Sequence, residues 1–226
     1  MNLVNVMNGL IKEGDYKDYL EIGVGQGNTL NLIKCHNKIG VDIRTKTTAD
    51  YIMSADEFFE IAYRKTLLFD IIFIDGNHDY EYVKRDIDNS LRHLRPHGTI
   101  ICHDTLPVSK GNTNEDGWQG MGTAYKAIMD LRMNNPDVVI CSIDYGNYEI
   151  ERGLIPPKDR KYITNSPILN GDGTGIETVG VSIIIKGAQS CYESLDLNWS
   201  NYEKHKHKLM NILSFSDFKE WFDDNL

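Results

Sequence analysis

The stretch Tyr19-Leu20-Glu21-Ile22-Gly23-Val24-Gly25-Gln26-Gly27 decides the fold of this chain. It begins as a strand-like apolar run and continues into three glycines, which allow a tight turn and a close approach of the backbone to a ligand. Beyond the turn, Asn28 or Thr29 can cap a helix that continues through Ile33. Free N–H groups at the start of such a helix favour electron-rich ligand atoms. The stretch therefore predicts a strand, a ligand-binding loop and a helix.

Strands and helices alternate along the rest of the chain. Further apolar runs predict strands at residues 38–43, 51–53, 69–74, 99–102, 138–143 and 179–186. Helices are predicted at residues 57–64, along an apolar stripe from Tyr80 to Leu94 that Pro96 and Gly98 close, and at residues 121–133. This alternation, with right-handed crossovers, implies an α/β doubly wound, Rossmann-like and mostly parallel sheet. Ligands of such sheets bind outside the carboxyl ends of the strands.

Polar side chains come directly after most of the predicted strands. They are Asp42, Ser54 with Asp56, Asp75 with His78, and His103 with Asp104. Because the carboxyl ends of parallel strands meet at one edge of a sheet, we expect these side chains to crowd there. Asp42 is placed to accept hydrogen bonds from two ribose hydroxyls. Glu21, ahead of the first glycine, can accept from a ligand ammonium or anchor the loop.

The spacing of the glycines argues against a dinucleotide ligand. Dinucleotide sites need a third glycine three residues after the second, where the pyrophosphate lies close to the helix. That position holds Asn28 here, and the third glycine comes one residue earlier. An acid two residues before the first glycine also suits a cationic amino-acid ligand better than a diphosphate.

The opening stretch resembles motif I of the class I methyltransferases that use S-adenosylmethionine (SAM). Four further stretches are similar to the branch that contains the macrocin-type sugar O-methyltransferases: residues 51–59, Phe69–His78 with its Asp-Gly-x-His element, 94–98 and 101–105. The likeness covers roughly residues 15 to 150 and 177 to 187, and departs from the pattern between Gly153 and Thr178. It implies a seven-stranded, mostly parallel sheet whose last strand is antiparallel.

The resemblance also implies a role for each matched residue. The methionine part of SAM would be held by Glu21, Gly23, Gly25 and Gly27, the ribose by Asp42, and the adenine edge by Ser54 with Asp56. Asp75 and Asp104 would bind a divalent cation, and His78 would be the general base. Oxygen ligands suit Mg²⁺, whereas adding His103 to the shell would favour a softer ion such as Mn²⁺. We therefore expect SAM and a divalent metal, with Mg²⁺ first, as cofactors.

Composition narrows the partners and the location. The chain has 226 residues, with 33 Asp and Glu against 24 Lys and Arg. This net negative charge disfavours nucleic acid as a partner. The densest basic run, at residues 204–208, is interpreted as a solvated helix face and not as a strip that binds phosphates. The four scattered cysteines are interpreted as reduced core thiols, and no apolar run is long enough to span a membrane. We expect a cytoplasmic protein that acts on a small molecule or a glycan, and the sequence leaves its oligomeric state open.

The length favours one domain with additions. We expect a methyltransferase domain at residues 1–187, interrupted by an insertion rich in Pro, Gly and Asn at residues 153–178. A helical extension at residues 188–226 would follow it. Nothing in the composition assigns either addition to a pocket or to an interface.

Two other functions are also compatible with the sequence. The same fold class includes nicotinamide-dependent oxidoreductases, and a catalytically silent SAM-binding or glycan-binding module is a further alternative. Structural roles also compete with the catalytic ones: Ser54 with Asp56 and Asp75 can cap helices, and His78 can be a surface turn residue. The sequence therefore predicts an O-methyltransferase whose acceptor and metal are undecided.

Overall fold

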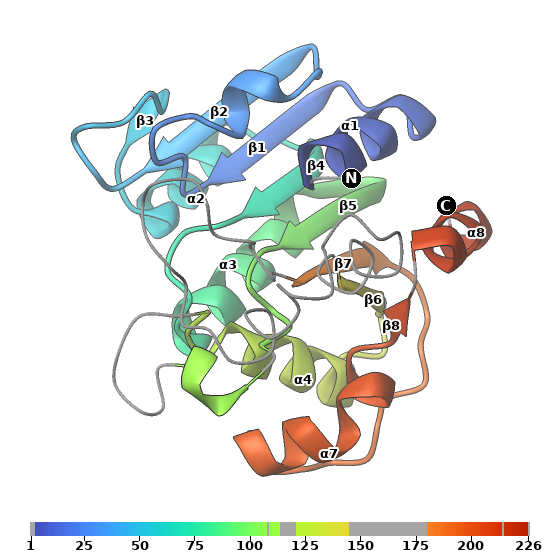
Figure 1. Cartoon of the computed structure of the whole chain (residues 1–226). Helices are drawn as coiled ribbons and strands as arrows, with labels where there is room; N and C mark the ends of the chain where they lie inside the picture. The colour runs from blue at the N-terminus through green and yellow to red at the C-terminus, as the bar shows by residue number, and fades with distance from the viewer. Residues whose placement is uncertain (1–2, 108, 114–120, 145–179, 214, 226) are drawn as a thin grey trace, which may run out of the picture.

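The computed structural model describes residues 3–107, 109–113, 121–144, 180–213 and 215–225 (Figure 1). Eight strands form one sheet in the order β3-β2-β1-β4-β5-β7-β6-β8. Their bounds are β1 Asp18–Ile22, β2 Asn37–Asp42, β3 Tyr51–Ile52, β4 Phe69–Ile74, β5 Leu94–Cys102, β6 Val138–Asp144, β7 Gly180–Lys186 and β8 Ile212–Leu213. The helices are α1 Leu3–Glu13, α2 Ala55–Arg64, α3 Tyr80–His93, α4 Ala124–Asn134, α7 Trp199–Leu209 and α8 Phe215–Asn225.

The first five strands are all parallel to one another. β1 lies in the centre of this half, between β2 and β4, and pairs Glu21 with Gly40 on one side and with Phe73 on the other. β7 runs antiparallel to both β5 and β6. The α/β, mostly parallel sheet with an antiparallel strand near its end is therefore confirmed, with one short strand, β8, more than the seven expected.

Helices cover both faces of the sheet, as Figure 1 shows. On one face α2, α3, α4 and α7 pack against the sheet through side chains such as Phe58, Val83, Ile128 and Tyr202. On the other face α1 and α8 supply apolar side chains, among them Met7 and Phe218. A strand covered on both faces is apolar at nearly every position, which explains the sequence of β4.

Two local predictions were wrong. The helix expected after the glycine loop is only a single 3-10 turn, Leu30–Leu32, and Thr29 makes no side-chain cap to it. Residues 94–98 were expected to close the preceding helix, but they begin β5, where Leu94 pairs with Phe69 before a shift of register. Tertiary pairing with β4 thus outweighs the local breaking tendency of Pro96 and Gly98.

The C-terminal extension takes part in the same sheet, because β8 pairs with β6 in parallel. The expected insertion at residues 153–178 lies outside the described residues. Cys102 and Cys141 lie buried in strands, as expected of core thiols, but Cys35 is only partly buried and Cys191 is exposed, so the prediction was wrong for these two. Within the described part of the chain, no helix has both the length and the apolar character that a bilayer span requires.

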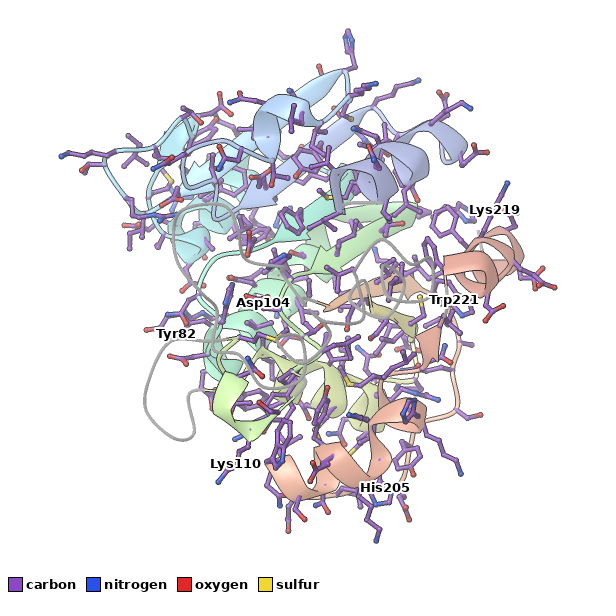
Figure 2. The ribbon with its side chains drawn as sticks, in the orientation of Figure 1. Tyr82, Asp104, Lys110, His205, Lys219 and Trp221 are labelled. Atoms are coloured by element: carbon purple, nitrogen blue, oxygen red, sulfur yellow. The ribbon has the colours of Figure 1, made fainter. Side chains whose placement is uncertain are left out.

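Figure 2 labels His205 on α7, at the lower edge of the molecule, and Asp104 near the centre of the view. The basic run at residues 204–208 lies on the solvent-facing side of α7, where Lys204, His207 and Lys208 are exposed. His205 packs against the ring of Tyr192 and lies 3.0 Å from its hydroxyl oxygen. The run is therefore a helix surface with a local structural contact, as the sequence indicates.

Candidate functional site

The glycine loop forms a tight turn after β1. Gly23, Gly25 and Gly27 all have positive φ angles, of 91°, 58° and 80°. Side chains with a Cβ atom rarely adopt such angles, which explains why glycine occupies all three positions. A Cβ atom at Gly27 would lie 2.2 Å from the hydroxyl oxygen of Thr48, so this glycine also allows close packing within the protein.

Glu21 is buried beneath the loop, with 1% of its surface exposed. Its carboxylate accepts a hydrogen bond of 2.6 Å from the hydroxyl of Tyr19, and the backbone of Leu30 also hydrogen-bonds to it. Burial, reinforced by the charge of Asp75, raises the pKa of Glu21 to about 7, although the hydrogen bond from Tyr19 acts in the opposite direction. Of the two roles considered for Glu21, anchoring the loop matches these contacts, and a contact with the methionine part stays a prediction.

Asp42 lies at the end of β2 and reaches back to the glycine loop. It accepts hydrogen bonds from the backbone N–H of Gly25 at 2.7 Å and of Arg44 at 2.8 Å. The guanidinium of Arg44 contacts both carboxylate oxygens, at 3.1 and 3.0 Å. Burial raises the pKa of Asp42, but the bonds from Arg44 and Gly25 outweigh burial and lower it. Asp42 is therefore an ionised acceptor at the loop.

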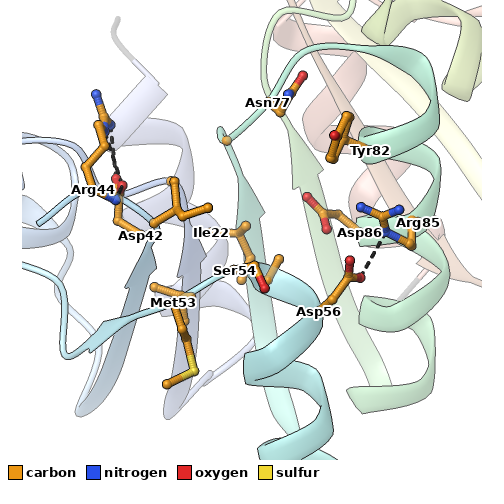
Figure 3. A pocket seen from close by; sticks show the side chains of 15 residues that line it. Ile22, Asp42, Arg44, Met53, Ser54, Asp56, Asn77, Tyr82, Arg85 and Asp86 are labelled. Atoms are coloured by element: carbon orange, nitrogen blue, oxygen red, sulfur yellow. Dashed lines mark hydrogen bonds and ion pairs between the residues drawn. The ribbon is translucent and has the colours of Figure 1, made fainter.

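A cavity of about 540 Å³ opens beside this acceptor, at the carboxyl ends of β1, β2 and β4 (Figure 3). Its volume falls within the range of small-molecule sites. The residues that line it include Gly23, Asp42, Arg44, Met53, Ser54, Asp56, Gly76, Asn77, Tyr82, Arg85 and Asp86. Four of the predicted cofactor residues therefore share one cavity: Gly23, Asp42, Ser54 and Asp56. Glu21, which lies in β1, and Gly25 and Gly27 of the loop are not among the residues that line it.

Ser54 and Asp56 have structural partners as well as positions in the cavity wall. Ser54 caps α2 in a capping box with Glu57, so its hydroxyl is engaged. Asp56 forms an ion pair of 2.9 Å with Arg85 of α3. The capping reading of Ser54 is thus correct, while Asp56 connects α2 to α3 across the cavity wall.

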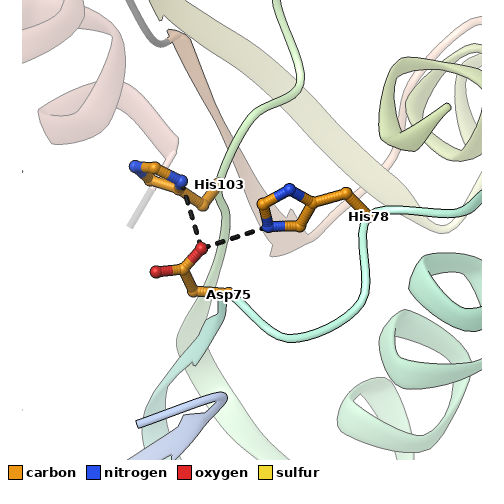
Figure 4. A group of neighbouring side chains, drawn as sticks. All are labelled: Asp75, His78 and His103. Atoms are coloured by element: carbon orange, nitrogen blue, oxygen red, sulfur yellow. Dashed lines mark hydrogen bonds and ion pairs between the residues drawn. The ribbon is translucent and has the colours of Figure 1, made fainter. Parts of the chain in front are cut away.

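Beyond β4 and β5, four titratable side chains form a second cluster. Asp75 and His103 come directly after these strands, His78 follows Asp75 in the loop before α3, and Asp104 has a left-handed φ of 56°. Figure 4 shows both imidazoles turned toward Asp75. Asp75 Oδ1 lies 3.3 Å from His78 Nε2 and 3.1 Å from His103 Nδ1. Asp104 lies 3.1 Å from His78 and 3.3 Å from His103, so each carboxylate contacts both rings.

The alternation of acids and histidines sets the protonation of the cluster. Burial lowers the pKa of His78, but hydrogen bonds and charge from Asp104 and Asp75 outweigh it and raise the pKa to about 9. The same two carboxylates raise the pKa of His103 well above its usual value. Burial raises the pKa of Asp75 and Asp104, yet His103 and His78 outweigh it and lower both. The four groups therefore form a neutral set of two carboxylates and two imidazolium ions.

The cluster has the donors that a divalent cation requires. One ligand atom each from Asp75, His78 and His103 lie within 4.8 Å of one another. Asp104 is outside this set but touches both imidazoles. The buried atoms His103 Nδ1 and Asp104 Oδ1 have no hydrogen-bond partner within the described chain, although they lie 3.3 Å apart. Such unsatisfied atoms are expected where a bound ion completes the site. With the histidines deprotonated, the residues present therefore fit a cation with mixed oxygen and nitrogen ligands.

The start of α4 holds the loop that carries His78. The carbonyl oxygen of His78 accepts from the backbone N–H of Thr123 at 2.8 Å, and the hydroxyl of Thr123 accepts from the N–H of Tyr80 at 2.8 Å. Gly122, with a φ of 60°, has no room for a side chain, because a Cβ atom would lie 2.4 Å from the His78 carbonyl oxygen. The sequence did not predict this support, which joins residues more than 40 positions apart.

Comparisons with known proteins point to methyltransferases. Residues 20–105 match the model of a family described as a methyltransferase domain. The fold is that of a class I methyltransferase. A comparison with curated protein sequences gives no match.

Solved methyltransferase structures have the same fold at low sequence identity. The O-methyltransferase from Bacillus cereus, in complex with S-adenosylhomocysteine (SAH), is 15% identical over 81% of this chain and 80% of its own, with a TM-score of 0.53. TomG from Streptomyces achromogenes, an O-methyltransferase of tomaymycin synthesis in complex with SAM, is 12% identical over 81% and 78%, with a TM-score of 0.54. These likenesses establish the fold. The residues matched by the methyltransferase domain include the glycine loop, the cavity wall and the four-residue cluster.

Several residues of the site carry no sequence signal of a known motif. Arg44, Tyr82, Arg85 and Asp86 all line the cavity but were not predicted. Asp86 could have been noticed, because it lies on the buried stripe of α3 next to Val83 and Ile87, where an acid is unusual. His103 was treated mainly as a neighbour of the site, and the structure places it in direct contact with both acids.

Proposed function

We propose that this protein is a SAM-dependent O-methyltransferase that acts on a hydroxyl group of a sugar, a glycan or a small secondary metabolite. One observation carries the proposal. The segment Asp75–His78 contributes Gly76 and Asn77 to the cavity and Asp75 and His78 to the acid and histidine cluster. A nucleoside in the cavity would therefore lie next to groups able to bind and deprotonate a hydroxyl.

The reaction is an in-line displacement in which an acceptor oxygen attacks the methyl carbon and the bond from that carbon to sulfur breaks. Holding the two reactants in line can account for much of the rate increase, since effective molarities in oriented systems reach about 10⁵ to 10⁸ M. In the proposal the glycine loop and Asp42 hold the nucleoside of SAM. The acceptor hydroxyl lies at the cluster, where its proton passes to His78 Nε2 or Nδ1.

Asp75 and Asp104 would hold a divalent cation, which would lower the pKa of the acceptor hydroxyl and fix its position. Without a cation, the two carboxylates keep the imidazole protonated at neutral pH, and a protonated ring cannot accept a proton. A cation held by Asp75 and Asp104 would offset the charge that raises the pKa of His78, which would favour the neutral imidazole that a base requires.

The acceptor class follows from composition and from the family resemblance. A net charge of −9 disfavours a nucleic-acid acceptor. The Asp-Gly-x-His element at residues 75–78 resembles that of the macrocin-type sugar O-methyltransferases, which supports a sugar or a related hydroxyl compound. The match to a methyltransferase domain favours SAM over a nicotinamide cofactor.

Binding and turnover test the proposal separately. Calorimetric titration should show binding of SAM and SAH and no comparable binding of NAD⁺ or NADH; tight binding of NADH without SAM would reject the proposal. Methyl transfer should then be assayed with a panel of sugars and phenolic hydroxyl compounds, with Mg²⁺ or Mn²⁺ and with a chelator. Asp75→Ala and His78→Ala should abolish turnover while SAM still binds. Unchanged turnover in both variants would show that the proposed cluster is not catalytic.

A further inference from the structure

Asp86 is a buried acid in the wall of the cavity. It lies in the middle of α3, 5% of its surface is exposed, and Figure 3 shows its side chain directed from α3 into the cavity. Buried carboxylates normally have a positively charged or hydrogen-bonding partner. Asp86 therefore needs an explanation that the fold of α3 does not supply.

The guanidinium of the neighbouring residue, Arg85, pairs with a different acid. The Nε atom of Arg85 pairs with Asp56 at 2.9 Å, and the guanidinium lies over the ring of Tyr82, 4.9 Å from its centre. Within the described chain, the Asp86 carboxyl interacts with Asp56 and Arg85 through charge alone. Burial, followed by the repulsive charge of Asp56, raises the pKa of Asp86 to about 7, and Arg85 offsets this only in part. The acceptor atoms of Asp86 thus face the cavity without a donor.

The position of Asp86 relative to Asp42 defines which part of a nucleoside it would meet. In Figure 3, Asp42 and Asp86 lie on opposite sides of the cavity, with Ile22 and Ser54 between them. If the ribose hydroxyls bind Asp42, the base extends away from Asp42 across the apolar lining supplied by Ile22, Met53 and Ala55. The edge of the base then reaches α3. Adenine in a nucleoside carries one strong hydrogen-bond donor, its 6-amino group.

We propose that Asp86 recognises the adenine ring by accepting a hydrogen bond from its 6-amino group, and so selects a 6-aminopurine nucleoside as the cofactor. This inference rests on the proposed function, because it places the nucleoside of SAM in the cavity. A carboxylate at this place also disfavours bases with a 6-oxo group, since two acceptors would face each other. Neither the glycine loop nor Asp42 can provide this selectivity, because they contact other parts of the ligand.

Calorimetry with two ligands and three variants tests the inference. The ligands are SAH and an SAH analogue with hydrogen in place of the 6-amino group. The wild-type protein should bind SAH about tenfold more tightly than the analogue, the effect of one hydrogen bond to a charged or buried acceptor. Asp86→Leu, which keeps the branched shape of the side chain and removes the acceptor, should bind both ligands equally. Asp86→Asn, whose side-chain oxygen can still accept, should keep part of the preference for SAH.

Asp88→Ala is the matched control, because Asp88 is a solvent-exposed acid on the same helix that pairs with Lys84. It should keep the full preference for SAH, and thermal melts should show that all variants fold. If Asp86→Leu keeps the wild-type preference for SAH over the analogue, Asp86 does not recognise the 6-amino group and the inference is overturned. The proposed cofactor site is not affected by that result. If the wild-type protein binds neither ligand, the proposed function itself fails.

Discussion

Gly23 packs directly against the backbone of Asp75. A Cβ atom at Gly23 would lie 2.2 Å from the carbonyl oxygen of Asp75, and Gly23 has a φ of 91°. The N–H of Asp75 in turn donates to the carbonyl of Ile22 at 2.8 Å. The turn of the glycine loop and the first acid of the cluster are therefore fixed to each other. A substitution in the loop should shift the position of Asp75.

Gly23→Ala should impair both binding and stability. The new methyl group would collide with backbone atoms that cannot rotate away, and the residue would keep an unfavourable positive φ. We expect a loss of about 2 kcal/mol or more in the free energy of unfolding and a weaker affinity for SAM. Urea denaturation and calorimetry measure the two effects. Gly9→Ala in α1 is the control: nothing lies within 4 Å of its Cβ position, so it should stabilise the protein slightly. Equal stability of the two variants would contradict the close packing at Gly23.

Asp42 and Arg44 should contribute unequally to SAM binding. Asp42 is buried and accepts two backbone hydrogen bonds, whereas the side chain of Arg44 is 65% exposed. Ion pairs with an exposed partner contribute about 0–1 kcal/mol, so Arg44→Ala should change SAM affinity less than about fivefold. Asp42→Ala should weaken it about tenfold or more, because the ribose loses its acceptor and Gly25 loses its partner. A larger effect of Arg44→Ala than of Asp42→Ala would mean that the guanidinium, rather than the carboxylate, contacts the ligand.

His103→Gln should destabilise the protein when divalent cations are absent. The substitution leaves Asp75 and Asp104 buried with His78 as the remaining cation of the cluster, and removing one partner of a buried ion pair typically costs about 3–5 kcal/mol. If Asp75 and Asp104 hold the metal, added Mg²⁺ should raise the melting temperature of this variant more than that of the wild type. A smaller rise than in the wild type would show instead that His103 is itself a ligand.

Glu21 should make stability depend on pH. Its pKa is raised from 4.5 in the unfolded chain to about 7 in the folded protein, so the folded state binds this proton more tightly. The stability that the protonated group provides is complete below about pH 4.5 and is lost as the pH rises through 7. Glu21→Gln cannot titrate, so its stability relative to the wild type should improve between pH 5 and pH 8, by about 3 kcal/mol at most. Asp86 titrates in the same range in both proteins, so its contribution cancels in this comparison.

Chemical denaturation at the two pH values measures this difference. Tyr19→Phe offers a second check, because it removes the hydroxyl that donates to Glu21. Without that donor the ionised form of Glu21 is less favourable, so the pH dependence of Tyr19→Phe should be at least as large as that of the wild type. A pH-independent difference between Glu21→Gln and the wild type would mean that Glu21 is already ionised in the folded protein at low pH.

Much of the fold follows from local sequence patterns. The run Phe69–Ile74, apolar apart from Asp70, predicts the bounds of β4, and the glycines predict the turn after β1. Local sequence patterns gave wrong predictions where pairing between strands far apart in the chain decides the structure. Pro96 reads as a stop signal, yet Leu94 lies in β5 because it pairs with Phe69. The residues from Asn28 to Ile33 read as a helix, but form one 3-10 turn before the chain must return to pair Asn37 with Asp18.

The sequence by itself determined which residues end the parallel strands, and therefore that Asp42, Asp75 and Asp104 share one edge of the sheet. The hydrophobic periodicity and the composition of each segment are enough for this prediction, because each strand and the loop after it are adjacent in the sequence. Only the tertiary structure decided which side chains meet: that His103 touches Asp75, that Arg85 pairs with Asp56, and that Asp86 faces the cavity with no donor among the described residues. These contacts depend on the register between strands and on the packing of α3 against α2, which residues far apart in the chain set together.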